Sequence, residues 1–249
     1  MSNIKTYLIT GANRGLSRSL LEALARRQNT TVIAGVRDLS STSSKSLSDI
    51  STATGSRIIP VAISSIDDLS PSQAVETLQA THSVTSIDVV IANAGISQYY
   101  GRVSETPLSE VRDHFEVNTI GVLTLYQATL PLLLKSPTPV FVALSTAVTS
   151  IGAIGDIPIP ATAYGMSKVA LIYMVRKIHF ENEKLTAFVL TPGWVQTEMG
   201  NTRAAAMGLE SAPVKMEDSI KGMLEKIDNA TREETSGTLQ SFDEKKHPW

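Results

Sequence analysis

A tyrosine and a lysine stand four residues apart in the segment Thr162-Ala-Tyr-Gly-Met-Ser-Lys168. At that spacing in a helix, Tyr164 and Lys168 lie on the same face. A free tyrosine has a pKa near ~10, and a neighbouring cation favours the phenolate and lowers that pKa. The pair therefore predicts proton transfer by a phenol that an ammonium tunes. Taken alone, the spacing is more typical of a polar helix surface, so the rest of the chain decides between the two interpretations.

The composition is that of a globular protein and excludes several classes of partner. The chain has 249 residues, 42% hydrophobic and 18% charged, with a net charge of −2. That charge gives no reason to expect nucleic acid or an anionic membrane as a partner. There is no cysteine and the four histidines are widely spaced, so we expect no bound metal. Without a signal peptide or an apolar run of roughly 18 residues, we expect a cytoplasmic protein.

The elements that must position the tyrosine and the lysine alternate along the chain. Short apolar runs typical of strands cover residues 6–10, 31–35, 57–63, 87–92, 140–144, 186–190 and 237–242. Helical patterns lie between them, over residues 16–27, 71–81, 108–134, 166–179 and 216–229. Ser70 is the predicted cap of the second of these helices. The alternation predicts one α/β domain over residues 1–249, a Rossmann-type, doubly wound, mostly parallel sheet of about seven strands with helices on both faces.

Ligands of such sheets bind beyond the carboxyl ends of the strands, near the switch in strand order. After the first strand comes the glycine turn Thr10-Gly11-Ala-Asn-Arg14-Gly15-Leu-Ser17. Its glycines allow a tight turn and a close approach of the backbone to a pyrophosphate at a helix N-terminus.

Arg37 follows the second strand, and Arg14 lies in the glycine turn. Two guanidinium groups favour the 2′-phosphate of NADP(H) over the free ribose hydroxyl of NAD. Asp38 argues against this modestly, and the alternative is that Arg37 is a solvated turn residue.

These motifs resemble those of the short-chain dehydrogenase/reductase superfamily. The glycine turn has its Gly-x-x-x-Gly spacing, with Ser17 in place of a third glycine. Asn93-Ala94-Gly95, after the fourth strand, is similar to its Asn-Asn-Ala-Gly segment, and Pro192-Gly193 follows the sixth strand as in that superfamily. The resemblance covers the whole chain and implies hydride transfer between a nicotinamide and a carbonyl or carbinol carbon.

The resemblance also implies roles for particular residues. Tyr164 would protonate the developing alkoxide, while Lys168 would lower the pKa of Tyr164 and hold the nicotinamide ribose. Asn118 would carry a water into the proton relay. Thr146 would orient the substrate carbonyl beside Ser145, with a shift by one residue, Thr149 or Ser150 as alternatives. The implied cofactor-binding residues are Gly11, Asn13, Arg14, Gly15, Leu16, Arg37, Ser64, Asn93, Ala94, Gly95, Asn118, Tyr164, Lys168, Pro192, Gly193, Val195 and Thr197.

Within the superfamily, residues 164–182 and 192–200 are similar to the fungal norsolorinic acid ketoreductase group. This implies NADPH-dependent reduction of a ketone on an aromatic polyketide, a small-molecule substrate, and a homodimer or homotetramer. Residues 199–214 would cover the substrate, with Tyr99, Tyr100, Trp194 and the loop 151–160 in an apolar pocket. For the two tyrosines, an exposed surface loop is an equal alternative.

Two other functions remain open from the sequence. The same fold and cofactor could serve an isomerase, dehydratase or cyclase without net redox chemistry, which the altered residues Ser17, Ser64 and Thr146 motivate. A non-enzymatic NADP-binding regulator is the third possibility. The Tyr164–Lys168 pair argues against the regulator, because pure binding needs no proton relay.

Overall fold

The computed structural model describes residues 4–157 and 159–248. Its sheet has seven strands in the order β3-β2-β1-β4-β5-β6-β7, and every pairing is parallel. The strands are β1 (Lys5–Thr10), β2 (Thr30–Val36), β3 (Arg57–Ala62), β4 (Val89–Ala92), β5 (Val140–Leu144), β6 (Thr186–Thr191) and β7 (Leu239–Ser241). The predicted Rossmann-type fold is confirmed. Strand order reverses between β1 and β4, so the switch point lies where these two strands end.

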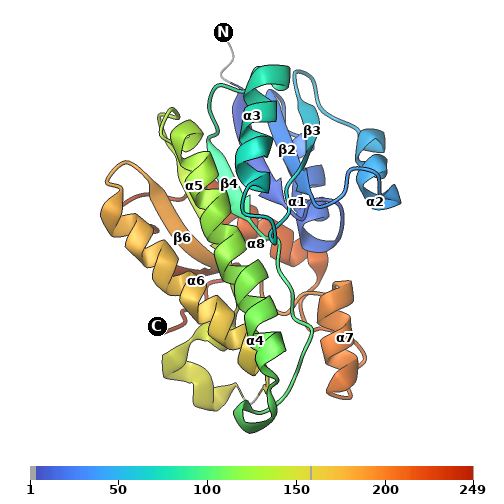
Figure 1. The fold of residues 1–249 in the computed structure, drawn as a ribbon, viewed down its shortest axis with the longest axis vertical. Helices are drawn as coiled ribbons and strands as arrows, with labels where there is room; N and C mark the ends of the chain where they lie inside the picture. Colours follow the sequence, from blue (N-terminus) through green and yellow to red (C-terminus); the bar gives the residue numbers. More distant parts are fainter. Residues whose placement is uncertain (1–3, 158, 249) are drawn as a thin grey trace.

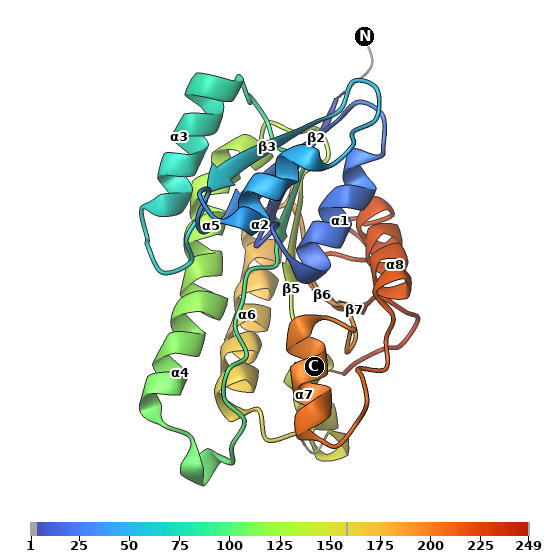
Figure 2. The ribbon, with the colours of Figure 1, turned by 90° about the vertical axis from the view of Figure 1, so that its right-hand side faces the viewer.

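Helices cover both faces of the sheet (Figures 1 and 2). One face carries α3 (Ser70–His82), α5 (Gly121–Leu133) and α6 (Thr162–Glu181), and the other carries α1 (Gly15–Ala25) and α8 (Met216–Asp228). Two helices extend the molecule beyond the strand ends, α4 (Leu108–Phe115) and α7 (Glu198–Ala206). The short segments are α2 (Thr42–Lys45), η1 (Ser46–Asp49), η2 (Val103–Glu105), η3 (Glu116–Ile120), η4 (Ala147–Thr149) and η5 (Ile151–Asp156).

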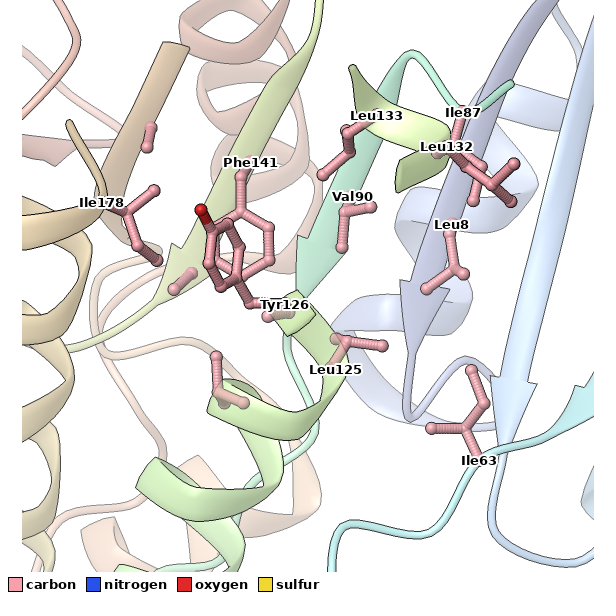
Figure 3. Packing of buried hydrophobic residues seen from close by; sticks show 14 of the residues in the cluster. Leu8, Ile63, Ile87, Val90, Leu125, Tyr126, Leu132, Leu133, Phe141 and Ile178 are labelled. Carbon is pink, nitrogen blue, oxygen red and sulfur yellow. The ribbon is translucent and has the colours of Figure 1, made fainter. Parts of the chain in front are cut away.

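The core has two halves, one on each face of the sheet. Between α5 and the sheet, Tyr126 packs edge-on against Phe141 with ring centroids 5.2 Å apart, and Leu125 lies nearby (Figure 3). On the opposite face, Leu20 of α1 and Met223 of α8 are fully buried. Because both faces are covered, β2, β4, β5 and β6 are buried along their whole length, which explains their continuous apolar sequences.

The helix predicted over residues 108–134 is interrupted. A π-helical turn, η3, separates α4 from α5. Apolar periodicity does not reveal the interruption, because a single wide turn changes the helix by about one residue. Its position coincides with Asn118, a predicted site residue.

Two helix starts also differ from the prediction. Ser70 is the first residue of α3 and not its cap, since its Oγ accepts a hydrogen bond from the Ser64 backbone N–H at 2.9 Å. The helix that carries Tyr164 begins at Thr162, four residues earlier than expected. α7 had no predicted counterpart, because its sequence Glu-Met-Gly-Asn-Thr-Arg-Ala-Ala-Ala has no apolar stripe.

Candidate active site

Tyr164 and Lys168 lie one turn apart near the start of α6, beside the carboxyl ends of β4 and β5. The Thr162 Oγ donates a hydrogen bond to the Gly101 carbonyl at 2.9 Å, and the Gly101 N–H donates to the Pro160 carbonyl at 2.7 Å. These bonds tie the loop after β4 to the beginning of the helix. α6 also packs against η3 and η4, so three separate chain segments fix the position of the pair.

Lys168 is buried and its ammonium points at a strand end. Nζ donates a hydrogen bond to the Leu144 carbonyl, the last residue of β5, at 2.7 Å. Burial lowers the pKa of Lys168 to about 8. A Cβ at Gly95 would lie 3.5 Å from this Nζ and 2.9 Å from the Asn118 Oδ1. A glycine at position 95 is therefore needed for the loop after β4 to pass so close to both side chains.

Tyr164 is half-buried, and its phenol is held neutral. Burial raises the pKa of Tyr164 to about 12, the Tyr100 phenol acts in the same direction, and the Arg203 guanidinium opposes both. The expected lowering of this pKa by Lys168 is absent, and Arg203 is the cation that acts on the Tyr164 phenol. The His114 ring meets the Tyr164 ring edge-on, with centroids 6.5 Å apart. At neutral pH the Tyr164 hydroxyl therefore holds a proton that it can donate.

Asn118 joins α6, the helix that carries Tyr164, to the loop after β4. Its Oδ1 accepts from the Ile96 N–H at 2.8 Å, while Nδ2 donates to the Ile96 carbonyl and to the Ser167 Oγ, both at 3.0 Å. The side chain is fully buried and both amide protons are used. Asn118 therefore clamps the site through its side chain, and only its main-chain carbonyl is a candidate for binding a relay water.

Four hydroxyl groups follow β5, and only the one on Thr146 belongs to a residue that is not buried. The Ser145 Oγ lies 3.4 Å from the Thr149 Oγ, which donates to the Thr146 carbonyl at 2.5 Å. The Ser150 hydroxyl donates to the Pro248 carbonyl. The Thr146 Oγ accepts from the Val148 N–H at 3.4 Å and so keeps its own proton to donate. Ser145, Thr149 and Ser150 are buried inside the loop, which favours Thr146 as the group that meets a substrate.

The glycine turn lies against the segment after β4. Gly11 and Gly15 have φ values of +69° and +56°, a region that favours glycine. The Thr10 Oγ accepts from the N–H groups of Asn93 and Ala94, both at 3.1 Å. The Ser17 Oγ donates to the Thr10 carbonyl at 3.1 Å. The serine that replaces a third glycine is therefore accommodated, and it adds a hydrogen bond between helix and strand.

The N-terminus of α1 is open to a ligand. No described side chain caps this helix, and a Cβ at Gly15 would have no atom within 4 Å. Leu16, which follows, packs partly buried against the core. The first N–H groups of the helix have no partner within the helix, so they are available to a phosphate.

The predicted arginines and their neighbours lie around this turn. Arg14 and Arg37 are both exposed. Arg14 forms an ion pair with Glu198, the first residue of α7, at 3.2 Å, while Asn13 donates to the Ser43 Oγ at 2.8 Å. An exposed ion pair contributes little free energy, so Arg14 can exchange Glu198 for an anionic ligand.

The segment after β6 anchors α7. Gly193 has a φ of +81°, and a Cβ there would lie 2.6 Å from the Phe242 ring. The Pro192 carbonyl accepts from the Ser219 Oγ at 2.7 Å, and the buried Val195 forms a β-bridge with Val214. The Thr197 Oγ accepts from the Gly200 N–H at 3.0 Å and caps α7. The hydroxyl of Thr197, one of the implied cofactor-binding residues, thus has a structural partner.

The structure separates the two tyrosines that the sequence left open, and it adds two residues that the sequence did not predict. Tyr100 belongs to the site, since its phenol influences Tyr164 and lies 2.9 Å from the Ser97 Oγ. Tyr99 turns away, and its hydroxyl donates to the Glu105 carbonyl at 3.1 Å. His114 and Arg203 have no motif around them, and only the folding of α4 and α7 brings them to Tyr164. Position 158 of the predicted pocket loop lies outside the described residues.

Comparison with known proteins agrees with this arrangement. The family described as short chain dehydrogenase matches residues 5–208. The chain belongs to this family. Norsolorinic acid ketoreductases of Dothistroma septosporum and Aspergillus parasiticus are 42% and 43% identical to it, over 98% and 93% of this chain and 92% and 86% of theirs.

Solved structures give the same result. The NADPH-bound carbonyl reductase from chicken fatty liver is 25% identical, with a TM-score of 0.86, and the match covers 99% of this short-chain dehydrogenase and 100% of that chain. Carbonyl reductase Sniffer of D. melanogaster, at 24% identity over 99% and 100% of the two chains, shares the fold with a TM-score of 0.85. The short-chain dehydrogenase described here is therefore an oxidoreductase of the kind that uses a nicotinamide dinucleotide.

In the described part of this short-chain dehydrogenase, no helix has the length and apolar character needed to cross a bilayer. Within the same residues, no group of three or more histidine, cysteine, aspartate or glutamate side chains is arranged to hold a metal ion.

Proposed function

We propose that the protein is an NADPH-dependent ketoreductase that reduces a ketone of an aromatic polyketide or a similar secondary metabolite, with Tyr164 as proton donor. The observation that carries this is the neutral Tyr164 phenol beside the buried Lys168 at the switch point of the sheet. The two curated relatives, named as norsolorinic acid ketoreductases, support the substrate class.

The residues at the strand ends fit a dinucleotide. The uncapped start of α1 and the open space at Gly15 suit a pyrophosphate, which the turn from Gly11 to Leu16 would hold. Arg14 and Arg37 are exposed and near enough in sequence to the turn and β2 to meet a 2′-phosphate. Asn93, Ala94 and Gly95 border the same edge, together with Ser64 after β3.

Other residues would hold the nicotinamide end. Lys168 would hold the ribose, and the main chain from Pro192 to Val195 would border the ring and its carboxamide, with Thr197 beyond it. When bound, the nicotinamide supplies the hydride to the carbonyl carbon of the substrate.

The chain's own residues handle the proton. The Thr146 hydroxyl would donate a hydrogen bond to the substrate carbonyl oxygen and fix its position. Tyr164 would deliver its proton to the same oxygen as negative charge develops there. With a pKa of about 12, the phenol remains protonated at neutral pH. A water on the main-chain carbonyl of Asn118 would return the proton by way of Lys168.

The structure gives no support to the non-redox alternative. It was motivated by Ser17, Ser64 and Thr146. Ser17 donates to the Thr10 carbonyl, the Ser64 N–H donates to the Ser70 Oγ at the start of α3, and Thr146 is the least buried of the four hydroxyl-bearing residues after β5. These replacements are thus compatible with the ordinary chemistry of the family. Membership of an oxidoreductase family likewise argues against a pure regulator.

The proposal is tested by incubating the protein with NADPH and a panel of aromatic and aliphatic ketones while following the absorbance of the reduced nicotinamide. Tyr164→Phe should lower turnover by about two orders of magnitude or more, because the proton donor is lost. Tyr99→Phe is the matched control, since its hydroxyl bonds to the Glu105 carbonyl outside the site. Equal turnover by wild type and Tyr164→Phe would refute the mechanism.

Cofactor choice is tested separately with Arg37→Ala. This variant should raise KM for NADPH by roughly 10-fold or more, with little change for NADH, because only NADPH carries the 2′-phosphate. Arg112→Ala, an exposed arginine of α4, is the control. Equal effects on both cofactors would remove Arg37 from the 2′-phosphate site.

A further inference from the structure

α7 presents an arginine to the site that has no counter-charge. The Arg203 guanidinium lies over the Trp194 ring, with Cζ 4.8 Å from the ring centroid. Its Nε is buried without a hydrogen-bond partner, and within the described residues no carboxylate forms an ion pair with it. Burying a guanidinium N–H without an acceptor destabilises the folded protein. A ligand that pairs with this arginine would offset part of that cost.

The position of Arg203 is built by several contacts. The Trp194 Nε1 donates to the Gly200 carbonyl at 2.9 Å, which orients the indole beneath the helix. The Thr197 cap fixes the start of α7, and the Asn201 Oδ1 accepts from the Ala212 N–H at 3.0 Å, which fixes the returning chain. Arg203 therefore has a defined place and is not a freely swinging surface side chain.

The guanidinium lies within electrostatic range of the reacting centre. Burial lowers the pKa of Arg203 and the phenols of Tyr100 and Tyr164 oppose that shift, while Arg203 in turn acts to lower the pKa of Tyr164. A substrate whose carbonyl oxygen meets Tyr164 would thus extend from the proton donor towards α7. The planar, stacked guanidinium offers several N–H donors to an oxygen acceptor on that substrate.

We infer that Arg203 is a specificity residue that binds an anionic oxygen, a carboxylate or an ionised phenol, on an aromatic ketone whose carbonyl lies at Tyr164. This inference rests on the proposed ketoreductase function and narrows its substrate class. An anion at this position pairs with the terminal N–H groups of the partly exposed guanidinium and supplies the counter-charge that no described carboxylate provides. One face of the guanidinium stacks on the Trp194 ring in a cation–π contact, and the N–H groups at its edge remain for the ligand.

The test compares aryl ketones that differ in one group, a carboxylate against its carboxamide and a phenol against its methyl ether. Wild type should favour the carboxylate by about 10- to 100-fold in kcat/KM, mostly through KM. Arg203→Met should abolish this preference, because it lowers kcat/KM for the carboxylate by about 10- to 100-fold more than for the carboxamide, whereas any effect through Tyr164 falls equally on both ketones. Arg203→Lys should keep part of the preference, and Arg112→Met on α4 should keep all of it.

The pair of phenolic ketone and methyl ether distinguishes a site for ionised phenols from a site for carboxylates. For the phenolic ketone, kcat/KM of wild type should rise as pH passes the pKa of that phenol, whereas its methyl ether and the Arg203→Met variant should show no such rise. A preference for the carboxylate without this rise assigns the site to carboxylates; the rise assigns it to ionised phenols as well. No preference for either anion overturns the inference.

A binding measurement keeps this inference separate from the proposed reaction. Quenching of tryptophan fluorescence by a non-reactive arenecarboxylate should be saturable in wild type, and weaker by at least about 10-fold in Arg203→Met and for the matching carboxamide. Binding of this kind without turnover of any ketone would refute the ketoreductase function while retaining the anion site. If Arg203→Met lowered kcat/KM equally for neutral and anionic ketones, the anion site would be overturned. The role of Arg203 would then be to shift the pKa of Tyr164.

Discussion

Lys168 is a buried ammonium that donates to the Leu144 carbonyl, and Tyr164 is a half-buried phenol with a raised pKa. For both residues burial opposes ionisation. Tyr164 is thereby kept as a proton donor, while Lys168 is held charged at neutral pH at a cost to the folded state. The site thus keeps an unfavourable charge where the proposed chemistry needs one.

Lys168→Met should be inactive but more stable than wild type at pH 7 without nucleotide, by on the order of 1–3 kcal/mol. The pKa of Lys168 is about 8 in the folded protein and 10.5 ordinarily. Between these values the unfolded chain binds the extra proton, so wild-type stability should rise with pH from 8 to 10. Above pH 10 the raised pKa of Tyr164 acts in the opposite direction.

Urea unfolding at pH 7, 8, 9 and 10 measures this. Lys177→Met serves as the control, because Lys177 lies on the same helix in an exposed pair with Glu181. A wild-type stability that stays flat or falls between pH 8 and 10 would contradict the burial argument.

The hydroxyl after β5 gives a second prediction at this scale. Thr146→Val should lower kcat by about 10- to 1000-fold, since it removes the group that orients the carbonyl. Ser145→Ala should have a smaller effect on kcat, because the Ser145 hydroxyl already faces Thr149 inside the loop. Steady-state kinetics of the two variants decide the assignment, and a larger loss for Ser145→Ala would reverse it.

Two irregular elements bring the site together. η3 places Asn118 where its amide meets the main chain of Ile96. α7 lies outside the two helical layers (Figure 2) and carries Arg203 to Tyr164. Asn118 holds η3 against the loop after β4, while Trp194 and Thr197 of the segment after β6 hold α7. Neither element depends on an apolar stripe of its own.

Gly200→Ala tests how α7 is held. The added Cβ would lie 1.9 Å from the Val195 carbonyl oxygen, so the helix must shift. Helix propensity alone would make alanine better by about 1 kcal/mol, so the sign of the effect is informative. We expect faster proteolysis within α7 and a roughly 10-fold or greater loss of kcat/KM. Gly155→Ala is the control, with no atom within 4 Å of the added carbon; a stabilised, fully active Gly200→Ala would contradict the packing.

The surface of the whole molecule carries an apolar stripe along α6. Met166, Tyr173 and Phe180 lie seven residues apart on one helix face and are 47%, 71% and 65% exposed. Such a stripe is typical of an interface between identical chains, as the sequence-based expectation of an oligomer requires.

Light scattering after size-exclusion chromatography should therefore find a dimer or tetramer. The double change Tyr173→Glu and Phe180→Glu should shift it to the monomer, because it places charge at the centre of the stripe. Ile66→Glu, an exposed apolar residue after β3, should leave assembly unchanged. A monomeric wild type would remove the α6 stripe as an interface.

The sequence by itself determined the alternation of strands and helices, which predicts the parallel sheet, and the location of the candidate active site at the strand ends. Local patterns can be recognised directly in the sequence. They include the apolar runs of β4 and β5, the glycine turn from Gly11 to Gly15 and the spacing of Tyr164 and Lys168.

Only the tertiary structure decided what surrounds that pair. Arg203 and His114 come from distant segments with no motif, and the structure also decided between the two interpretations of Tyr100. The π turn at Asn118 and the helix α7 depend on contacts with the segments after strands rather than on periodicity. The pKa of Tyr164 likewise depends on burial, which no spacing specifies. Contacts between residues far apart in sequence exist only once the chain is packed, so they left no local pattern to read.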